Sequence, residues 1–151
     1  FKAYYYGGGE AEAFELARSL SRDYEVVVLS RYSKGEHGNV RVIGPGFFGP
    51  NVLEGALAFV GFGGTMSQEA LLMGVPTVSA YPGGYRVELE LARRGLILKA
   101  GNLEEAIDLV HRAIEGSREL RERAAAFGRG LIDPAKFAVG ELSRLAGRFT
   151  V

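Results

Sequence analysis

The stretch VGFGGTMSQE, residues 60–69, decides the fold. It begins at the end of an apolar run, passes through two adjacent glycines and continues into a pattern with helical spacing. A strand, a glycine turn and a helix in immediate succession are the repeating unit of parallel α/β sheets. We therefore expect a strand at residues 57–61 and a helix at residues 65–73, which Gly74 would end in a left-handed conformation.

The same unit recurs on both sides of this stretch, so strand and helix patterns alternate along the chain. Such alternation favours a parallel sheet covered by helices on both faces. We predict a Rossmann-like three-layer α/β/α sandwich with a mostly parallel six-stranded sheet, and a polar loop at residues 30–39. Strands are expected at residues 2–6, 24–29, 40–43, 57–61, 76–80 and 96–98, and helices at residues 10–20, 51–55, 65–73, 87–94, 102–115, 117–127 and 134–145.

The length of 151 residues fits one domain, and 47% hydrophobic with 24% charged residues is ordinary for a folded globular chain. We expect residues 1–151 to be a single domain on which the helices of residues 102–147 pack. The chain opens at Phe1 on a strand-like run, which suggests that its start is a cut made at a domain boundary.

Composition excludes several classes of function. The formal net charge of zero gives no reason to expect a nucleic-acid partner. Without cysteine the chain has neither disulfides nor thiolate metal sites, and no apolar run is long enough for a membrane span. We expect a cytoplasmic protein without a metal or a cofactor, and the sequence leaves a homo-oligomer open.

Several polar residues are expected to be ordinary surface residues. His37 and His111 stand without a partner motif, and no spacing suggests a metal site. Glu88 and Glu90 could approach a ligand from the helix at residues 87–94, but a solvated helix face is the simpler interpretation.

Four glycine-rich loops follow predicted strands, at residues 7–9, 44–49, 61–64 and 82–84. In an open parallel sheet, ligands bind beyond the carboxyl ends of the strands, where these loops would meet. Glycine allows the backbone to approach an anion closely. We therefore expect the binding site at this edge of the sheet.

The loop at Gly63, Gly64 and Thr65 carries the strongest chemical signal. Backbone N–H groups at the start of the following helix could bind a diphosphate, and Thr65 could cap that helix or turn its hydroxyl to a phosphate oxygen. Glu69, one turn later, could accept hydrogen bonds from the two hydroxyls of a ribose. The alternative is that the glycines make a tight turn and Glu69 is a solvated acid.

Two familiar nucleotide motifs do not fit. In a dinucleotide fingerprint after the first strand, Gly7 and Gly9 would match, but Glu12 occupies the position of the last glycine. Arg31 could face a 2′-phosphate, which keeps an NADP-dependent oxidoreductase as an alternative. The sequence contains no P-loop.

The sequences at residues 61–70, 74–79 and 81–83 resemble the C-terminal, donor-binding half of GT-B glycosyltransferases. The resemblance is closest to an uncharacterised family of predicted glycosyltransferases, which is itself similar to the non-hydrolysing UDP-GlcNAc 2-epimerases. It covers residues 1–98 and is strongest at residues 60–95.

This resemblance implies a site for a nucleotide sugar, with UDP as the expected nucleotide. It implies that Gly63, Gly64 and Thr65 hold the diphosphate, that Glu69 binds the ribose, and that residues 43–48 frame the base. It further places residues 7–9 at an interdomain cleft and residues 81–86 near the sugar or phosphates, with Arg86 as a charge partner. The substrate-binding residues so implied are Gly7, Gly8, Gly9, Gly44, Phe47, Phe48, Gly63, Gly64, Thr65, Glu69, Pro82, Gly83, Gly84 and Arg86.

Proteins of the family that the chain resembles need an N-terminal domain that supplies the acceptor site, and that half is absent here. The resemblance therefore implies that the chain is a fragment of a two-domain protein. We therefore expect a glycosyltransferase-like activity only when that domain is joined, and the isolated chain to be inactive. A UDP-sugar 2-epimerase-like domain and a non-catalytic nucleotide-binding or interaction module are the alternatives.

Overall fold

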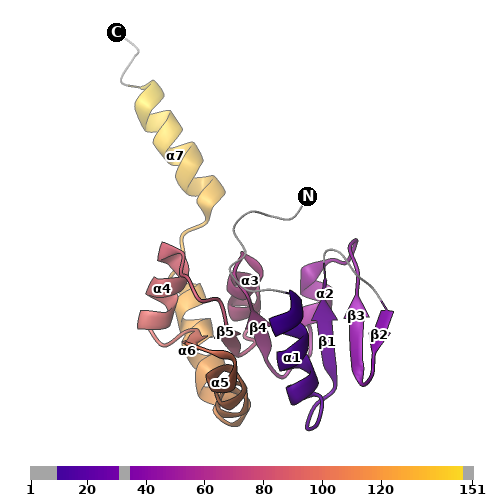
Figure 1. Ribbon diagram of the computed structural model, residues 1–151. Coiled ribbons are helices and arrows are strands. Elements are labelled where there is room, and N and C mark those ends of the chain that lie inside the picture. Colours follow the sequence, from indigo (N-terminus) through magenta and orange to yellow (C-terminus); the bar gives the residue numbers. More distant parts are fainter. Residues whose placement is uncertain (1–9, 31–34, 148–151) are drawn as a thin grey trace.

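The computed structural model describes residues 10–30 and 35–147 of the chain (Figure 1). The predicted strand at residues 2–6 lies outside these ranges. In chain order the described elements are α1 (Glu10–Leu20), β1 (Val26–Leu29), β2 (Gly35–His37), β3 (Val40–Ile43), α2 (Gly49–Leu53), β4 (Phe59–Gly61), α3 (Met66–Leu72), β5 (Thr77–Ser79), α4 (Arg86–Arg93), β6 (Leu98–Lys99), α5 (Leu103–Glu115), α6 (Ser117–Arg129) and α7 (Pro134–Ala146).

The described strands form two three-stranded sheets, in the orders β1-β3-β2 and β4-β5-β6. β1 is parallel to β3, and β4, β5 and β6 are parallel to one another, with Val60 opposite Val78. The predicted α/β class is confirmed. The single six-stranded sheet is not seen among the described residues.

The expected loop at residues 30–39 contains a strand instead. β2 pairs antiparallel with β3, with His37 opposite Val40. Gly38, at a φ of 64°, and Asn39 form the two-residue connection. A glycine followed by asparagine is a known hairpin signal, because the left-handed conformation turns the chain within two residues.

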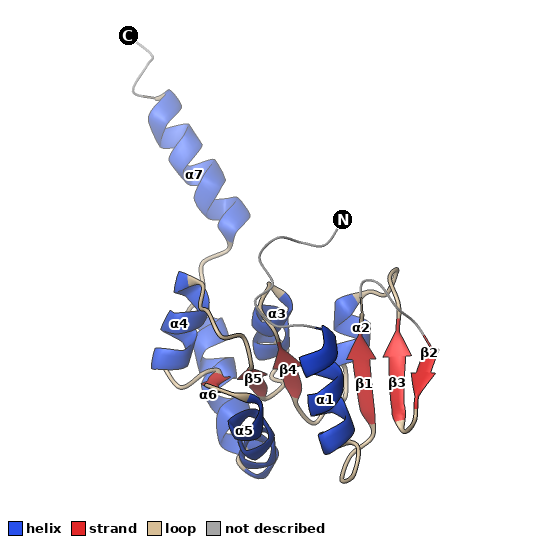
Figure 2. Ribbon diagram, in the orientation of Figure 1, coloured by secondary structure: helices blue, strands red, loops and turns tan. Residues whose placement is uncertain are grey.

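One hydrophobic core lies between helices α1 and α5 and the strands (Figure 2). Leu16 of α1 and Val110 of α5 are buried there together with Val78 of β5. Val26 of β1 and Val60 of β4 pack against the same cluster. Strands of both sheets therefore contribute to one core.

The opposite face of β4 packs against α2 and α3. Phe59 contacts a cluster formed by Leu53 of α2 and Ala70 of α3, whereas the next residue, Val60, belongs to the core under α5. Successive side chains of a strand point to opposite faces. The sheet at β4 is therefore covered by helices on both sides.

A third cluster joins α3, α4 and α6. Its buried members come from all three helices and from the segment before β6: Leu71, Leu91, Leu96, Ile97 and Ala124. Gly74 and Gly95 follow α3 and α4 with φ values of 76° and 66°. This is the left-handed conformation predicted for Gly74, and Gly95 ends its helix in the same way.

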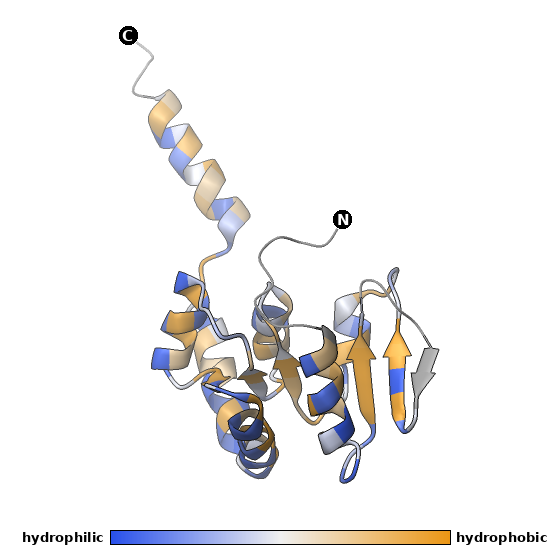
Figure 3. Ribbon diagram, viewed as in Figure 1, coloured by the Kyte–Doolittle hydropathy of each residue, from blue (hydrophilic) through white to orange (hydrophobic). Residues whose placement is uncertain are grey.

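Helix α7 differs from the sequence prediction. It extends away from the other described elements (Figure 1), and none of its residues is buried. Its hydrophobic residues alternate with hydrophilic ones (Figure 3), and Phe137, Val139 and Leu142 are each more than half exposed. The expected packing of this helix on the domain is not seen among the described residues, because no described element covers its apolar side chains. Of the helices described, none is both long and apolar enough to cross a membrane.

Candidate functional site

The loop between β4 and α3 is a tight turn built on two glycines. Gly63 and Gly64 adopt φ values of 94° and 103°, a left-handed conformation that favours glycine. The carbonyl of Thr65 accepts hydrogen bonds from the amides of Gln68 and Glu69 at 2.9 and 3.1 Å. The amides of residues 63–65 come before these first helical hydrogen bonds in the chain. The side chain of Thr65 makes no capping hydrogen bond.

Close packing fixes the base of this loop. Gly61, the last residue of β4, lies directly against Ser67 of α3, and a Cβ built on Gly61 would overlap the Ser67 hydroxyl. That hydroxyl is buried and has no hydrogen-bond partner within the described part of the chain. Glycine is therefore required at position 61 for space, since its φ is not left-handed.

The loop after β5 lies against the glycine turn. A Cβ built on Gly63 would lie 3.4 Å from the ring of Tyr81 and 3.6 Å from that of Tyr85. These two rings stack with centroids 5.6 Å apart and an angle of 7° between their planes. Tyr81 also packs against Gly83, where a Cβ would come within 2.7 Å of its ring. The structure therefore brings together two of the predicted loops, at residues 61–64 and 82–84.

Glu69 connects the turn to a third predicted loop. Its Oε2 atom lies 3.2 Å from the position of a Cβ on Gly49, the first residue of α2. The carboxylate is exposed, and no hydrogen bond or ion pair holds it within the described residues. It therefore stands at the surface between α3 and the loop at residues 44–48.

In that loop the two phenylalanines differ in exposure. Phe48 is 67% exposed, whereas Phe47 is partly buried. Gly46 has a φ of 98°, and Gly44 is partly buried. Phe48 is therefore the aromatic ring that this loop presents to solvent.

Sequence analysis missed a buried polar cluster at the carboxyl end of β5. Ser79 is fully buried and donates a hydrogen bond from Oγ to Oε1 of Glu88 at 2.5 Å. Glu88 is 2% exposed, so its assignment to a solvated helix face is wrong. Lys99 lies 3.2 Å from the same oxygen and compensates the buried negative charge.

The prediction that Glu90 lies on a solvated helix face is confirmed. It is partly exposed and forms ion pairs with Arg93 at 2.8 Å and Arg94 at 2.7 Å. Hydrogen bonds from Arg93 and then Arg94 lower the pKa of Glu90 to about 2. The group is therefore charged at all ordinary pH values and takes part in a surface ion-pair network.

The remaining predicted residues lie at the edges of this region or outside the described chain. Gly84 and Pro82 are exposed in the loop before α4. Arg86 begins α4, is exposed, and borders a groove between α4 and α6 that Phe127 and Leu131 also line. Residues 7–9 and Arg31 lie outside the described residues, so their predicted roles stay predictions.

His111 is not an isolated surface residue. Its Nδ1 shares a 2.8 Å hydrogen bond with the hydroxyl of Tyr24, and this contact links α5 to the segment before β1. Within the described residues, no group of three or more His, Cys, Asp and Glu side chains could hold a metal ion.

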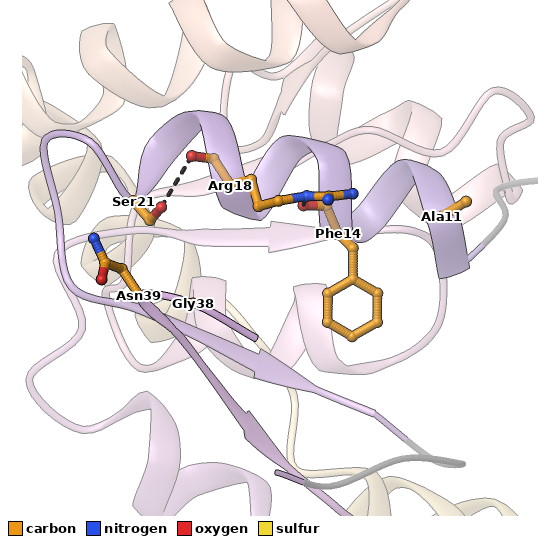
Figure 4. Close-up of a pocket in the computed structure, with 6 residues that line it drawn as sticks. All are labelled: Ala11, Phe14, Arg18, Ser21, Gly38 and Asn39. Atoms are coloured by element: carbon orange, nitrogen blue, oxygen red, sulfur yellow. Dashed lines mark hydrogen bonds between the residues drawn. The ribbon is translucent and has the colours of Figure 1, made fainter. Parts of the chain in front are cut away.

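A separate hollow lies between α1 and the β2–β3 hairpin (Figure 4). Phe14 and Arg18 of α1 line one side, and Gly38 and Asn39 of the hairpin line the other. Arg18 donates from Nε to the carbonyl of Phe14 at 3.3 Å, and Ser21 donates to the carbonyl of Arg18 at 2.9 Å. Among the described residues that line this hollow none is acidic, and the side chains of Arg18 and Ser21 bond to backbone carbonyls of α1, so we assign the candidate site to the glycine turn instead.

Comparison with known protein families gives a match over most of the chain. The family described as "Protein of unknown function (DUF354)" matches residues 22–134. The chain belongs to the DUF354 family. No curated protein and no solved structure matches it significantly.

The part of the chain that matches DUF354 contains the whole candidate site. It includes all six described strands and the helices from α2 to α6, and it ends at the first residue of α7. The glycine turn, the loops at residues 44–49 and 81–85, and the cluster around Glu88 all lie within it.

Proposed function

We propose that this DUF354 chain binds a nucleotide sugar, with a UDP-sugar as the expected ligand, and that it is the donor-binding half of a GT-B-type glycosyltransferase. One observation carries the proposal. The left-handed Gly63–Gly64 turn at the carboxyl end of β4 lies against the stacked Tyr81 and Tyr85 rings and leads into α3, which carries the exposed Glu69 carboxylate.

Each part of a nucleotide diphosphate has a matching group in this arrangement. The amides of residues 63–65 would bind the diphosphate, and Glu69 would accept hydrogen bonds from the ribose hydroxyls. Phe48, which is exposed and precedes the Gly49 that Glu69 approaches, would stack on the base. The sugar would then lie towards Tyr85.

The chemistry of such a site is electrostatic. Backbone N–H groups that are already oriented would stabilise the negative charge that develops on a departing diphosphate. A 2-epimerase-like reaction, in which the diphosphate leaves and returns, would use the same groups. The N-terminal domain, the cytoplasmic location and the inactivity of the isolated chain stay predictions.

We further propose that the two sheets are parts of one doubly wound sheet. In the Rossmann order 3-2-1-4-5-6, the second and third strands are neighbours, as are the fourth, fifth and sixth. The described orders β1-β3 and β4-β5-β6 have this relationship if one strand precedes α1. The sequence predicts such a strand at residues 2–6, which lie outside the described ranges.

Calorimetric titration of the chain with UDP, UDP-GlcNAc, GDP and NADP tests the proposal. We expect saturable binding of UDP or UDP-GlcNAc that weakens about tenfold or more in Glu69→Ala, which corresponds to about 1.4 kcal/mol. Glu104→Ala is the matched control, because Glu104 is also an exposed first-turn glutamate, on α5 and away from the turn.

Two results would contradict the proposal. Binding of none of the four nucleotides would remove the support for a nucleotide site in this chain. Binding of NADP alone would favour the oxidoreductase alternative.

A further inference from the structure

Lys99 is fully occupied by contacts within the protein. An ammonium group has three N–H donors, and Lys99 Nζ has three acceptors: the carbonyls of Tyr81 at 2.7 Å and Gly83 at 2.6 Å, and Oε1 of Glu88 at 3.2 Å. No donor is left for a phosphate. Its ammonium therefore ties β6 to the loop after β5, instead of contacting a ligand.

The carboxylate and the ammonium group of this cluster are largely shielded from solvent. Glu88 is 2% exposed, and the side chain of Lys99 is 24% exposed. Ser79 adds a hydrogen bond to the same carboxylate oxygen and lies 3.4 Å from the amide of Tyr81, which donates to it. Buried ion pairs add little net stability compared with apolar residues of the same shape, but they can fix one conformation. The conformation that this one fixes is that of the loop at residues 81–84.

The loop so fixed forms one wall of the glycine turn. The ring of Tyr81 lies between Gly63 and Gly83 and stacks on Tyr85. Lys99 Nζ also lies 5.9 Å from the centre of the Tyr81 ring. One of the two carbonyls that Lys99 holds belongs to Tyr81 itself, the residue whose ring lies against Gly63.

We propose that Lys99, Glu88 and Ser79 are positioning residues of the candidate site, because they hold the loop at residues 81–84 against Gly63 in the form that receives the ligand. The role of the loop in ligand binding rests on the proposed function. The bracing of the loop does not, since it is a property of the chain without ligand.

The double variant Glu88→Gln/Lys99→Met tests the bracing. It removes both charges together, so that neither is left buried without its partner, and the new amide oxygen can still accept from Ser79. Lys136→Met is the matched control, because Lys136 is an exposed lysine on α7. Hydrogen–deuterium exchange of the ligand-free proteins is measured at residues 81–85 and, as an internal reference, at β5 and β6.

We expect exchange at residues 81–85 to become at least about tenfold faster in the double variant, with β5 and β6 unchanged. A role in overall stability alone would speed exchange in both places. Unchanged exchange at residues 81–85 would overturn the proposal, as would a uniform increase. If the double variant does not fold, Ser79→Ala replaces it, because this change removes two hydrogen bonds of the brace and keeps the charge pair.

A UDP titration of the same variants separates this proposal from the proposed function. We expect UDP to bind the double variant about tenfold or more weakly than the wild type, and the Lys136→Met control like the wild type. If the loop loosens but UDP affinity is unchanged, the positioning role is refuted. If the wild type does not bind UDP, the proposed function fails while the exchange measurement still decides the bracing.

Discussion

Replacing Gly61 by alanine is expected to destabilise the domain through a single side chain, that of Ser67. A Cβ at position 61 would overlap Ser67 Oγ, while its next neighbours, Phe59 Cε1 at 3.1 Å and Ser67 Cβ at 3.6 Å, are much less crowded. Overpacking of this kind typically costs about 1–3 kcal/mol. Since alanine is otherwise better than glycine in a strand by about 0.5–1 kcal/mol, we expect a net loss of about 1–2 kcal/mol for Gly61→Ala.

Ser67→Ala should behave in the opposite way. The Ser67 hydroxyl is buried without a hydrogen-bond partner within the described residues, and an unsatisfied buried hydroxyl costs about 1–3 kcal/mol. The variant should therefore be as stable as the wild type or more stable by up to about 1 kcal/mol. Removing Oγ also makes room for a Cβ at position 61.

The double variant Gly61→Ala/Ser67→Ala completes a double-mutant cycle and decides whether the two residues are coupled. With Oγ gone, the tightest remaining neighbour of the new Cβ is Phe59 Cε1, at the far end of a side chain. We expect the pair to recover most of the stability lost in Gly61→Ala, which gives a coupling energy of about 1–2 kcal/mol.

Urea unfolding of the four proteins, followed by circular dichroism, measures these free energies, and an unchanged m value shows that the unfolding reaction is the same. The reasoning would be refuted if the free-energy changes of the two single variants summed to that of the double variant within about 0.5 kcal/mol. That result would show that the cost at Gly61 does not come from Ser67. Wild-type stability of Gly61→Ala would refute it directly.

Two further predictions concern Glu90 and the glycines that end or interrupt helices. The pKa of Glu90 is lowered to about 2 by Arg93 and Arg94. The ionised carboxylate therefore contributes to folding stability above pH 4.5, its ordinary pKa, and this contribution is lost as the pH falls through about 2. NMR titration should show the carboxyl protonating near pH 2, with the value moving upward in 1 M salt because the pair is exposed; a midpoint at its ordinary value would contradict the geometry. Gly74→Ala should destabilise by about 1 kcal/mol because its φ is 76°, whereas Gly128→Ala, inside α6 with nothing within 4 Å of the new Cβ, should stabilise by about 0.5 kcal/mol. Thermal unfolding compares the two alanine variants, and equal effects would contradict the conformational argument.

Local patterns predicted the helices closely. The helix predicted at residues 10–20 has the same bounds as α1, and the one predicted from residue 102 begins at the cap of α5, where the Asn102 side chain accepts from the Glu105 amide at 2.8 Å. These features depend on neighbours three or four positions away, which the sequence displays directly. The hairpin at Gly38 and Asn39 carried a local signal too, but the polar composition of residues 30–39 hid it.

Contacts between distant residues could not be predicted in the same way. A glutamate on an amphipathic helix is usually solvated, and nothing near Glu88 in sequence announces that Ser79 and Lys99 meet it. Whether strands share one sheet depends on pairing across the chain, and the sequence does not encode that pairing locally. Likewise, the apolar spacing of α7 predicts a buried face, but the partner that would bury it is not part of that pattern.

Of the predicted site residues, Glu69 gives a clearer mutational test of ligand binding than Gly63. Gly63 is left-handed, so the turn requires glycine there whether or not a ligand binds. A variant at Gly63 would change both the turn and any site, and a loss of affinity would have two explanations. Glu69 is different, because its exposed carboxylate has no hydrogen bond or ion pair within the described residues and the fold gains nothing evident from it. We therefore expect Glu69→Ala to leave the unfolding free energy within about 0.5 kcal/mol of the wild type. A loss of UDP affinity in that variant would then report contact with the ligand, whereas an equal loss of stability would assign Glu69 a structural role at Gly49.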